Sequence, residues 1–145
     1  MGKDTGRDQQ MPHQLSMGQF VRLLAALVQQ KGQKLPFKNQ EAWHLLFYEL
    51  KKNKAGPGRP KFLDTLRFDW DGASPKCQQL SEFLNALHFT ASVSGHNPGF
   101  AVIEIAPEIA DQWTKSLDPN DSDAKKYVND AVALAEREFA TVAVA

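Results

Sequence analysis

Apolar residues recur every three or four positions in several stretches of the chain, which is the spacing that places them on one face of an α-helix. The first stretch predicts a helix that begins after Ser16 and stops at Gly32. Ser16 and Gln19 form an S-x-x-Q capping box, in which each side chain bonds the other residue's free backbone N–H. The expected buried face consists of Phe20, Leu23, Leu24, Leu27 and Val28.

The same spacing predicts two more helices in the middle of the chain. One spans residues 39–52, with Asn39 as its N-cap and cations in its last turn, where they suit the helix dipole. The other begins at Ser74-Pro75, where serine is a good cap and proline fits the first helical position. The expected core positions are Trp43, Leu46, Phe47 and Leu50 in the first of these helices, and Cys77, Leu80, Phe83, Leu84 and Leu87 in the second.

Alternating apolar and polar residues predict three short strands. Leu66, Phe68 and Trp70 alternate with polar residues within 62–70, which is typical of a half-buried strand. Residues 89–94 and 100–105 are rich in Phe, Val and Ile, and five turn-forming residues separate them. This arrangement predicts a β-hairpin.

Two helices are expected to complete the chain. Pro107 opens the first, which ends near residue 117, and Ser122 or Asp121 caps the last one. One face of the last helix carries Tyr127, Val128, Ala131, Leu134 and Ala135.

The resulting order, α-α-β-α-β-β-α-α with one small antiparallel sheet, predicts a mostly helical α+β, winged-helix-like fold. The hairpin would be the wing, and the helix from Ser74 would be the recognition helix. We expect one globular domain over residues 16–139, because residues 1–15 have no apolar periodicity and predict a disordered tail. Residues 140–145 are expected to fray.

The composition of the chain indicates the kind of cellular compartment in which this protein is expected to work. The 145 residues are 42% apolar and 23% charged, which is ordinary for a globular domain with its own core. Cys77 is the single cysteine, so an internal disulfide is excluded and a reducing compartment is favoured. The sequence has no apolar leader and no run near the roughly 20 residues that span a bilayer. We therefore expect a cytoplasmic protein without a membrane partner.

Charge is distributed unevenly although the net charge is zero. Residues 1–61 hold 11 Lys/Arg and 4 Asp/Glu, whereas residues 62–145 hold 6 and 13. This asymmetry is typical either of a basic contact face or of two halves that neutralise each other in the fold. The densest basic stretch has no acidic residue among its cations, which are Lys51, Lys52, Lys54, Arg59 and Lys61.

One acidic cluster has the ligand chemistry of a metal site. Asp64, Asp69 and Asp71 lie close together in the sequence, and carboxylates bind Mg²⁺. The alternative is an acidic strand end followed by an Asp71-Gly72 turn, and no nucleophile or phosphate-binding motif lies nearby. The histidines show no zinc-binding spacing; they are His13, His44, His88 and His96.

Two further features have a catalytic and a structural interpretation. Cys77 would be an activated thiol at a helix N-terminus if a histidine lay beside it, but it also fits the apolar register of Leu80 and Leu84. Gly56-Pro57-Gly58 lacks the third glycine or the lysine of a phosphate-binding loop. The sequence therefore predicts no catalytic residue, no metal ligand and no cofactor.

Residues 68–72, with the helix from Cys77 to Leu87 and the hairpin, resemble the Panacea and YwgA-like group of small prokaryotic domains. Residues 45–50 match that group's Leu/Tyr-rich early helix, and the likeness covers roughly residues 37–106. Gly72-Ala73 stands where the group commonly has Gly-Pro. The resemblance implies a winged-helix-like fold and antitoxin-like or regulatory protein contacts, often in phage-defence or mobile-element settings. It implies no enzyme activity, no cofactor and no particular functional residue.

Three hypotheses for function follow. The leading one is a non-enzymatic binding module that contacts another protein through the basic loop 51–61 and the hairpin tip at His96 and Asn97. The second is a DNA-binding regulator of the winged-helix type. The third is a metal-dependent enzyme that uses the Asp cluster.

Overall fold

The structure, a computed structural model, describes residues 15–36, 40–54, 56–72, 74–90 and 102–140. It confirms a mostly helical α+β architecture. The terminal segments 1–14 and 141–145, expected to be disordered or frayed, lie outside the described residues. In chain order the elements are α2 (Met17–Gln30), β2 (Leu35–Pro36), α3 (Glu41–Lys52), the 3₁₀-helix η1 (Lys61–Thr65), β3 (Asp69–Asp71), β4 (Ser74–Lys76), α4 (Gln78–Thr90), β5 (Val102–Ile103), α5 (Pro107–Thr114) and α6 (Ser122–Ala140).

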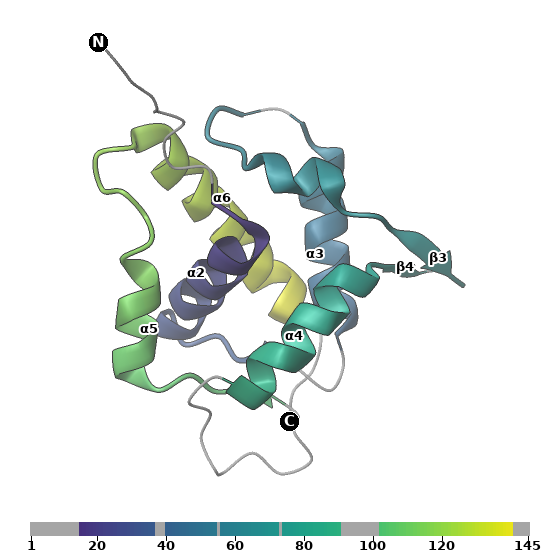
Figure 1. The fold of residues 1–145 in the computed structure, drawn as a ribbon, viewed down its shortest axis with the longest axis horizontal. Coiled ribbons are helices and arrows are strands. Elements are labelled where there is room, and N and C mark those ends of the chain that lie inside the picture. The colour runs from purple at the N-terminus through teal and green to yellow at the C-terminus, as the bar shows by residue number, and fades with distance from the viewer. Residues whose placement is uncertain (1–14, 37–39, 55, 73, 91–101, 141–145) are drawn as a thin grey trace.

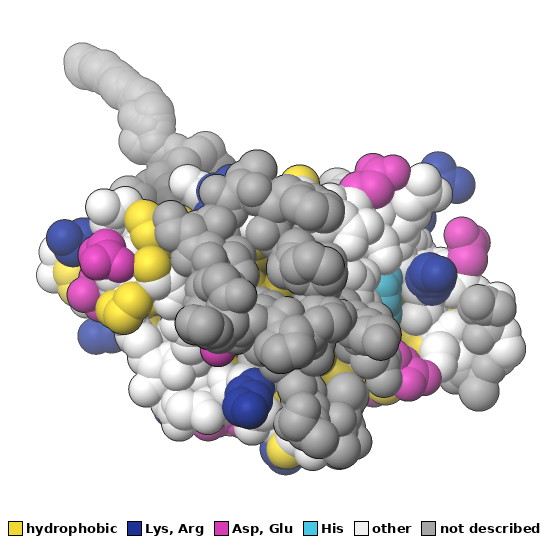
Figure 2. Space-filling view, turned by 90° about the horizontal axis from the view of Figure 1, so that it is seen from below, with side chains coloured by type: hydrophobic (Ala, Val, Ile, Leu, Met, Phe, Trp, Pro, Cys, Tyr) yellow, Lys and Arg dark blue, Asp and Glu magenta, His cyan; other side chains and the backbone are white. Residues whose placement is uncertain are grey.

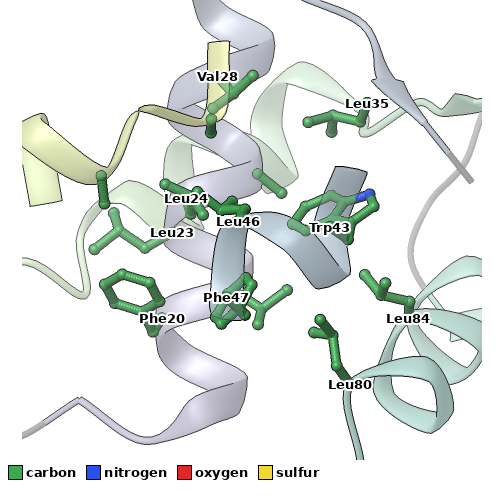
Figure 3. Packing of buried hydrophobic residues seen from close by; sticks show 14 of the residues in the cluster. Phe20, Leu23, Leu24, Val28, Leu35, Trp43, Leu46, Phe47, Leu80 and Leu84 are labelled. Atoms are coloured by element: carbon green, nitrogen blue, oxygen red, sulfur yellow. The ribbon is translucent and has the colours of Figure 1, made fainter. Parts of the chain in front are cut away.

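The core forms where the apolar faces of the helices meet. Helix α2 packs against α5 and α6, and α3 packs against α6 (Figure 1). Figure 3 shows Phe20 and Leu23 of α2 facing Phe47 of α3, with Leu80 and Leu84 of α4 closing one side. The Trp43 indole is fully buried, and its N–H donates a 2.6 Å hydrogen bond to the Pro36 carbonyl. A buried indole needs such a polar partner.

The predicted start and stop of α2 and the predicted cap of α6 are confirmed, whereas α3 begins at Glu41 with Gln40 as its N-cap and not Asn39. The capping box at the start of α2 joins the Ser16 backbone N–H to Gln19 Oε1 at 3.0 Å, and the Gln19 N–H to Ser16 Oγ at 3.2 Å. Gly32 has φ +90° after the last turn, as expected of a helix stop. Asp121 caps α6, because its Oδ1 accepts from the Ala124 N–H at 3.0 Å. The prediction that Leu15 belongs to a disordered tail is wrong, because Leu15 packs into the core.

The prediction that a helix begins at Ser74-Pro75 is wrong. Gly72, at φ +67°, turns the chain, so that β4 pairs antiparallel with β3 and Pro75 lies opposite Trp70. The Ser74 hydroxyl donates to a Glu41 carboxylate oxygen rather than capping a helix. Helix α4 begins four residues after Ser74, at Gln78. Serine and proline suit a turn or a strand edge as well as a helix start. The identities of Ser74 and Pro75 alone therefore do not distinguish a strand from the start of a helix.

The prediction of a hairpin over residues 89–94 and 100–105 is also wrong at the two ends that the structure describes. Helix α4 continues through Thr90, and β5 pairs with β2, placing Ile103 opposite Leu35. The rest of that hairpin, including His96 and Asn97, lies outside the described residues. Gln29 bonds both backbone groups of Ile105, with Nε2 donating to its carbonyl at 2.8 Å and Oε1 accepting from its N–H at 2.9 Å. The chain after β5 is therefore held against the end of α2.

Candidate interaction surface

The hairpin of β3 and β4 extends away from the helical body (Figure 1). β4 lies on the side toward α3, which it contacts, and pairs with β3 through three residue pairs: Asp69 with Lys76, Trp70 with Pro75, and Asp71 with Ser74. Two-residue turns of this kind favour glycine, which tolerates the positive φ of Gly72. The hairpin thus places β3 at the edge of the molecule.

Trp70 on β3 is 56% exposed, although the alternating pattern of 66–70 places it on a buried face. Among the residues that the structure describes, it is the one large apolar side chain with this exposure. Its ring does not project alone, because the Tyr48 ring of α3 meets it edge-on at a centroid distance of 5.3 Å. Tyr48 also meets Phe68 edge-on at 5.5 Å. Three aromatic rings thus form a continuous array that ends in solvent.

Two lysines border this array. The Lys51 ammonium lies 6.0 Å from the centre of the Phe68 ring and donates to the Leu66 carbonyl. The Lys52 ammonium lies 5.7 Å from the centre of the Tyr48 ring. Both distances are within the range of cation–π attraction. We call the five residues Tyr48, Lys51, Lys52, Phe68 and Trp70 the Trp70 ridge.

The other cations of the predicted basic surface have different environments. Lys54 is exposed and lies 3.7 Å from the Asp64 carboxylate, and Lys61 is exposed on η1. The Arg59 side chain is only 9% exposed. Its Nη2 donates to the Lys51 carbonyl at 2.9 Å, and its Nη1 lies 3.2 Å from Asp64. Arg59 therefore satisfies a carbonyl at the end of α3 and is not part of an open contact face.

The buried contacts of Arg59 predict that this side chain contributes to the stability of the fold. Replacing it with Met should lower the free energy of unfolding by about 2 kcal/mol, because the α3 carbonyls and Asp64 lose a charged donor. Lys54→Met, which removes an exposed cation from the same loop, should change stability by less than about 0.5 kcal/mol. Urea unfolding of both variants measures the difference. Equal effects of the two substitutions would contradict a structural role for Arg59.

The Asp cluster is divided by the fold. Asp64 lies on η1 and pairs with Arg59 and Lys54, whereas Asp69 is exposed on β3. Nothing is described of the Asp71 side chain. Within the described part of the chain, no three His, Cys, Asp or Glu side chains converge as a metal site would require. The cations beside Asp64 already neutralise the negative charge of its carboxylate, which a metal ion would otherwise balance.

His44 of α3 is buried, with 4% of its surface exposed. Its Nδ1 accepts the backbone N–H of Cys77 at 2.9 Å, and its Nε2 lies 3.3 Å from Ser81 Oγ. The Ser81 hydroxyl donates to Gln40 Oε1 at 3.1 Å. These bonds join α3 to the end of β4 and to the first turns of α4. The only sequence signal for them was a polar residue next to a buried Trp43.

The hydrogen bonds of His44 determine which ring nitrogen carries the proton of the neutral imidazole. Since Nδ1 accepts a hydrogen bond from an N–H group, the proton of the neutral ring is on Nε2 and points to Ser81. Burial lowers the pKa of His44, and the positive charge of Lys76 lowers it further. Cys77 is fully buried, as its apolar register predicts, and its Sγ lies 3.5 Å from Gln79 Oε1. His44 thus bonds the backbone of Cys77, and these contacts are those of a structural link.

The exposed amides of α4 already have partners within the protein. Gln78 Nε2 donates to Glu82 at 3.0 Å, Gln79 Oε1 accepts from the Arg67 N–H at 3.0 Å, and Asn85 Oδ1 accepts from Gln40 at 3.2 Å. A recognition helix needs such side chains available for base edges. On the face drawn in Figure 2, basic and acidic side chains are interspersed across the described surface. Neither feature is typical of a major-groove reader.

A pocket of about 370 Å³ lies between α3, the loop after it and α6. Leu50 and Leu134 give it an apolar side, and the ion pair of Lys126 with Asp130, 2.9 Å apart, lies on its rim. The Tyr127 hydroxyl is buried and has no hydrogen-bond partner within the described structure. Burial raises the pKa of Tyr127, and the charge of Arg59 opposes that change. The lining side chains carry both signs of charge and favour no single ligand class.

Comparisons of this chain with known protein families, curated proteins and solved structures find no match. Among the described helices, none combines the length and apolar character needed to cross a membrane.

Proposed function

We propose that this protein is a non-enzymatic binding module that acts by contacting another protein through the Trp70 ridge. The observation that carries the proposal is the 56% exposure of Trp70 at the end of an ordered aromatic array. Tryptophan is strongly enriched among the residues that dominate protein–protein binding energies, because it buries a large area with few rotatable bonds. The regulatory or antitoxin-like role implied by the resemblance to the Panacea and YwgA-like group belongs to the same proposal.

The neighbours of Trp70 support this role physically. Tyr48 comes from α3, which is anchored in the core by Trp43, Leu46 and Phe47. A ring that is already held in place loses less conformational freedom when a partner covers it.

The residues with catalytic chemistry support a binding role rather than an enzyme. Cys77 is fully buried, His44 bonds a backbone N–H, and Asp64 is paired with Arg59. Each of these side chains has a structural contact that accounts for its position. A DNA-binding role of the winged-helix type finds less support, because the amides of α4 are bonded within the protein.

Photocrosslinking in cells tests the proposal. Trp70 is replaced by p-benzoylphenylalanine, which retains an aromatic side chain, and Lys115 at the end of α5 is replaced in a matched control. Both side chains are exposed, so a nonspecific crosslink should form equally at both. We expect a discrete protein adduct at position 70 that is absent at position 115. No adduct at 70, or the same adducts at both positions, would refute contact through the ridge.

A further inference from the structure

The Trp70 ridge lies at one end of a strongly basic part of the chain. Residues 51–67 hold six Lys/Arg and one Asp, a formal charge of +5, and they run from the last turn of α3 through η1 to the start of β3. The single acid, Asp64, is already paired with Arg59 and Lys54. Within the described residues, no carboxylate lies within ion-pair distance of Lys52. Residues 51–67 therefore have a formal excess of positive charge and expose Lys52 within the ridge, whereas the hairpin that carries Trp70 also exposes Asp69.

We infer that the partner presents an acidic segment of a protein, in which an apolar side chain covers Trp70 and neighbouring carboxylates meet Lys52 and Lys54. This inference rests on the proposed function and specifies the partner. Lys52 is held against the Tyr48 ring, so a carboxylate at the ridge would meet a positioned ammonium rather than a mobile one. Complementary charge of this kind steers association and selects among partners.

The ridge favours a protein over a single-stranded nucleic acid. An exposed aromatic ring beside lysines also suits a stacked base with phosphates on the cations. However, Asp69 is exposed directly before Trp70, opposite Lys76 on the hairpin. A nucleic-acid strand carries a charge on every nucleotide, so a base on Trp70 would bring phosphates near this carboxylate. A peptide can place its carboxylates at the lysines and keep neutral residues beside Asp69.

The first experiment selects ligands without assuming the natural partner. A displayed library of random 12-residue peptides is selected for binding to the full chain, and binders that are retained by Trp70→Ala are removed. We expect the remaining peptides to be enriched in Asp and Glu and to carry at least one aromatic or large aliphatic residue. Selected peptides without acid enrichment would overturn the inference about partner chemistry. A failure to obtain any Trp70-dependent peptide would count against the ridge as a binding site.

The second experiment measures the charge dependence with one selected peptide. Lys52→Glu/Lys54→Glu should weaken binding by about tenfold or more, and raising the salt concentration should weaken wild-type binding as well. The control Lys34→Glu/Lys115→Glu makes the same change in net charge at two exposed lysines outside residues 51–67, and its affinity should stay within about twofold of wild type.

The outcomes separate the two claims. If Trp70-dependent peptides are obtained but both charge variants bind them like wild type, the ridge is a contact surface and the acidic partner is wrong. If the selection yields no Trp70-dependent peptide, the proposed function fails. Tighter binding of oligo(dT) than of the selected peptide, lost in Trp70→Ala, would replace the acidic protein segment with a single-stranded nucleic acid.

Discussion

Gly58→Ala is expected to lower the free energy of unfolding by about 3 kcal/mol, because two costs act at that position. Gly58 has φ +84°, a conformation that strains any residue with a Cβ atom. The added Cβ would also lie 2.6 Å from the Asp123 carbonyl carbon and 2.9 Å from the Ala124 nitrogen. Both are backbone atoms at the start of α6, so the loop between α3 and η1 would have to move away from that helix.

Gly32→Ala is the matched control for this experiment. Gly32 has nearly the same conformation, φ +90°, but among the described residues no atom beyond its chain neighbours lies within 4 Å of the site of its missing Cβ. Its substitution should cost about 1 kcal/mol from backbone strain alone. Thermal unfolding measures both, and we expect Gly58→Ala to melt about 10 °C below wild type. Equal losses in the two variants would contradict the close packing of the loop on α6.

Acidification is expected to destabilise the protein through His44. Its pKa in the folded state lies below the ordinary value of 6.5, so the unfolded chain binds a proton more readily at mildly acidic pH. The contribution of His44 to stability is therefore complete above pH 6.5 and is lost as pH falls through the pKa of the folded state. Protonation would place an N–H at Nδ1 facing the N–H of Cys77, which removes that hydrogen bond.

His44→Asn separates this effect from the other histidines. The Asn Oδ1 can accept the Cys77 N–H much as Nδ1 does, but an amide does not titrate. Between pH 7 and pH 5, wild type should lose about 1 kcal/mol more stability than His44→Asn does. Urea unfolding at the two pH values gives the comparison. Parallel losses in both proteins would show that His44 is not the group responsible.

The sequence was most informative where one local interaction decides the structure. The capping box of Ser16 and Gln19 and the helix stop at Gly32 depend on residues within one turn of each other. The apolar stripes also predicted correctly that Trp43, Phe47 and Leu80 are buried, because each lies on an amphipathic helix with a single apolar face.

Predictions failed where partners distant in the sequence decide the structure. Ser74 bonds Glu41, 33 residues away, so its hydroxyl does not cap a helix. β5 pairs with β2 across a long sequence separation, which a pattern of local turn residues cannot reveal. Trp70 fits the alternation of a half-buried strand, yet it is 56% exposed beside the Tyr48 ring. His44 has no local signature, because its partners are distant in the sequence: Cys77 lies between β4 and α4, and Ser81 lies on α4.

The measurement that tests the account most directly is the affinity of the crosslinked partner for wild type and for Trp70→Ala. Both proteins are first shown to unfold at the same temperature, since the indole is exposed and contributes little to the core. Loss of a dominant contact residue should weaken binding by about 30-fold or more, and Trp70→Phe, which keeps a flat ring, should recover part of that loss. Affinities of wild type and Trp70→Ala within threefold of each other would contradict the assignment of the Trp70 ridge as the functional surface.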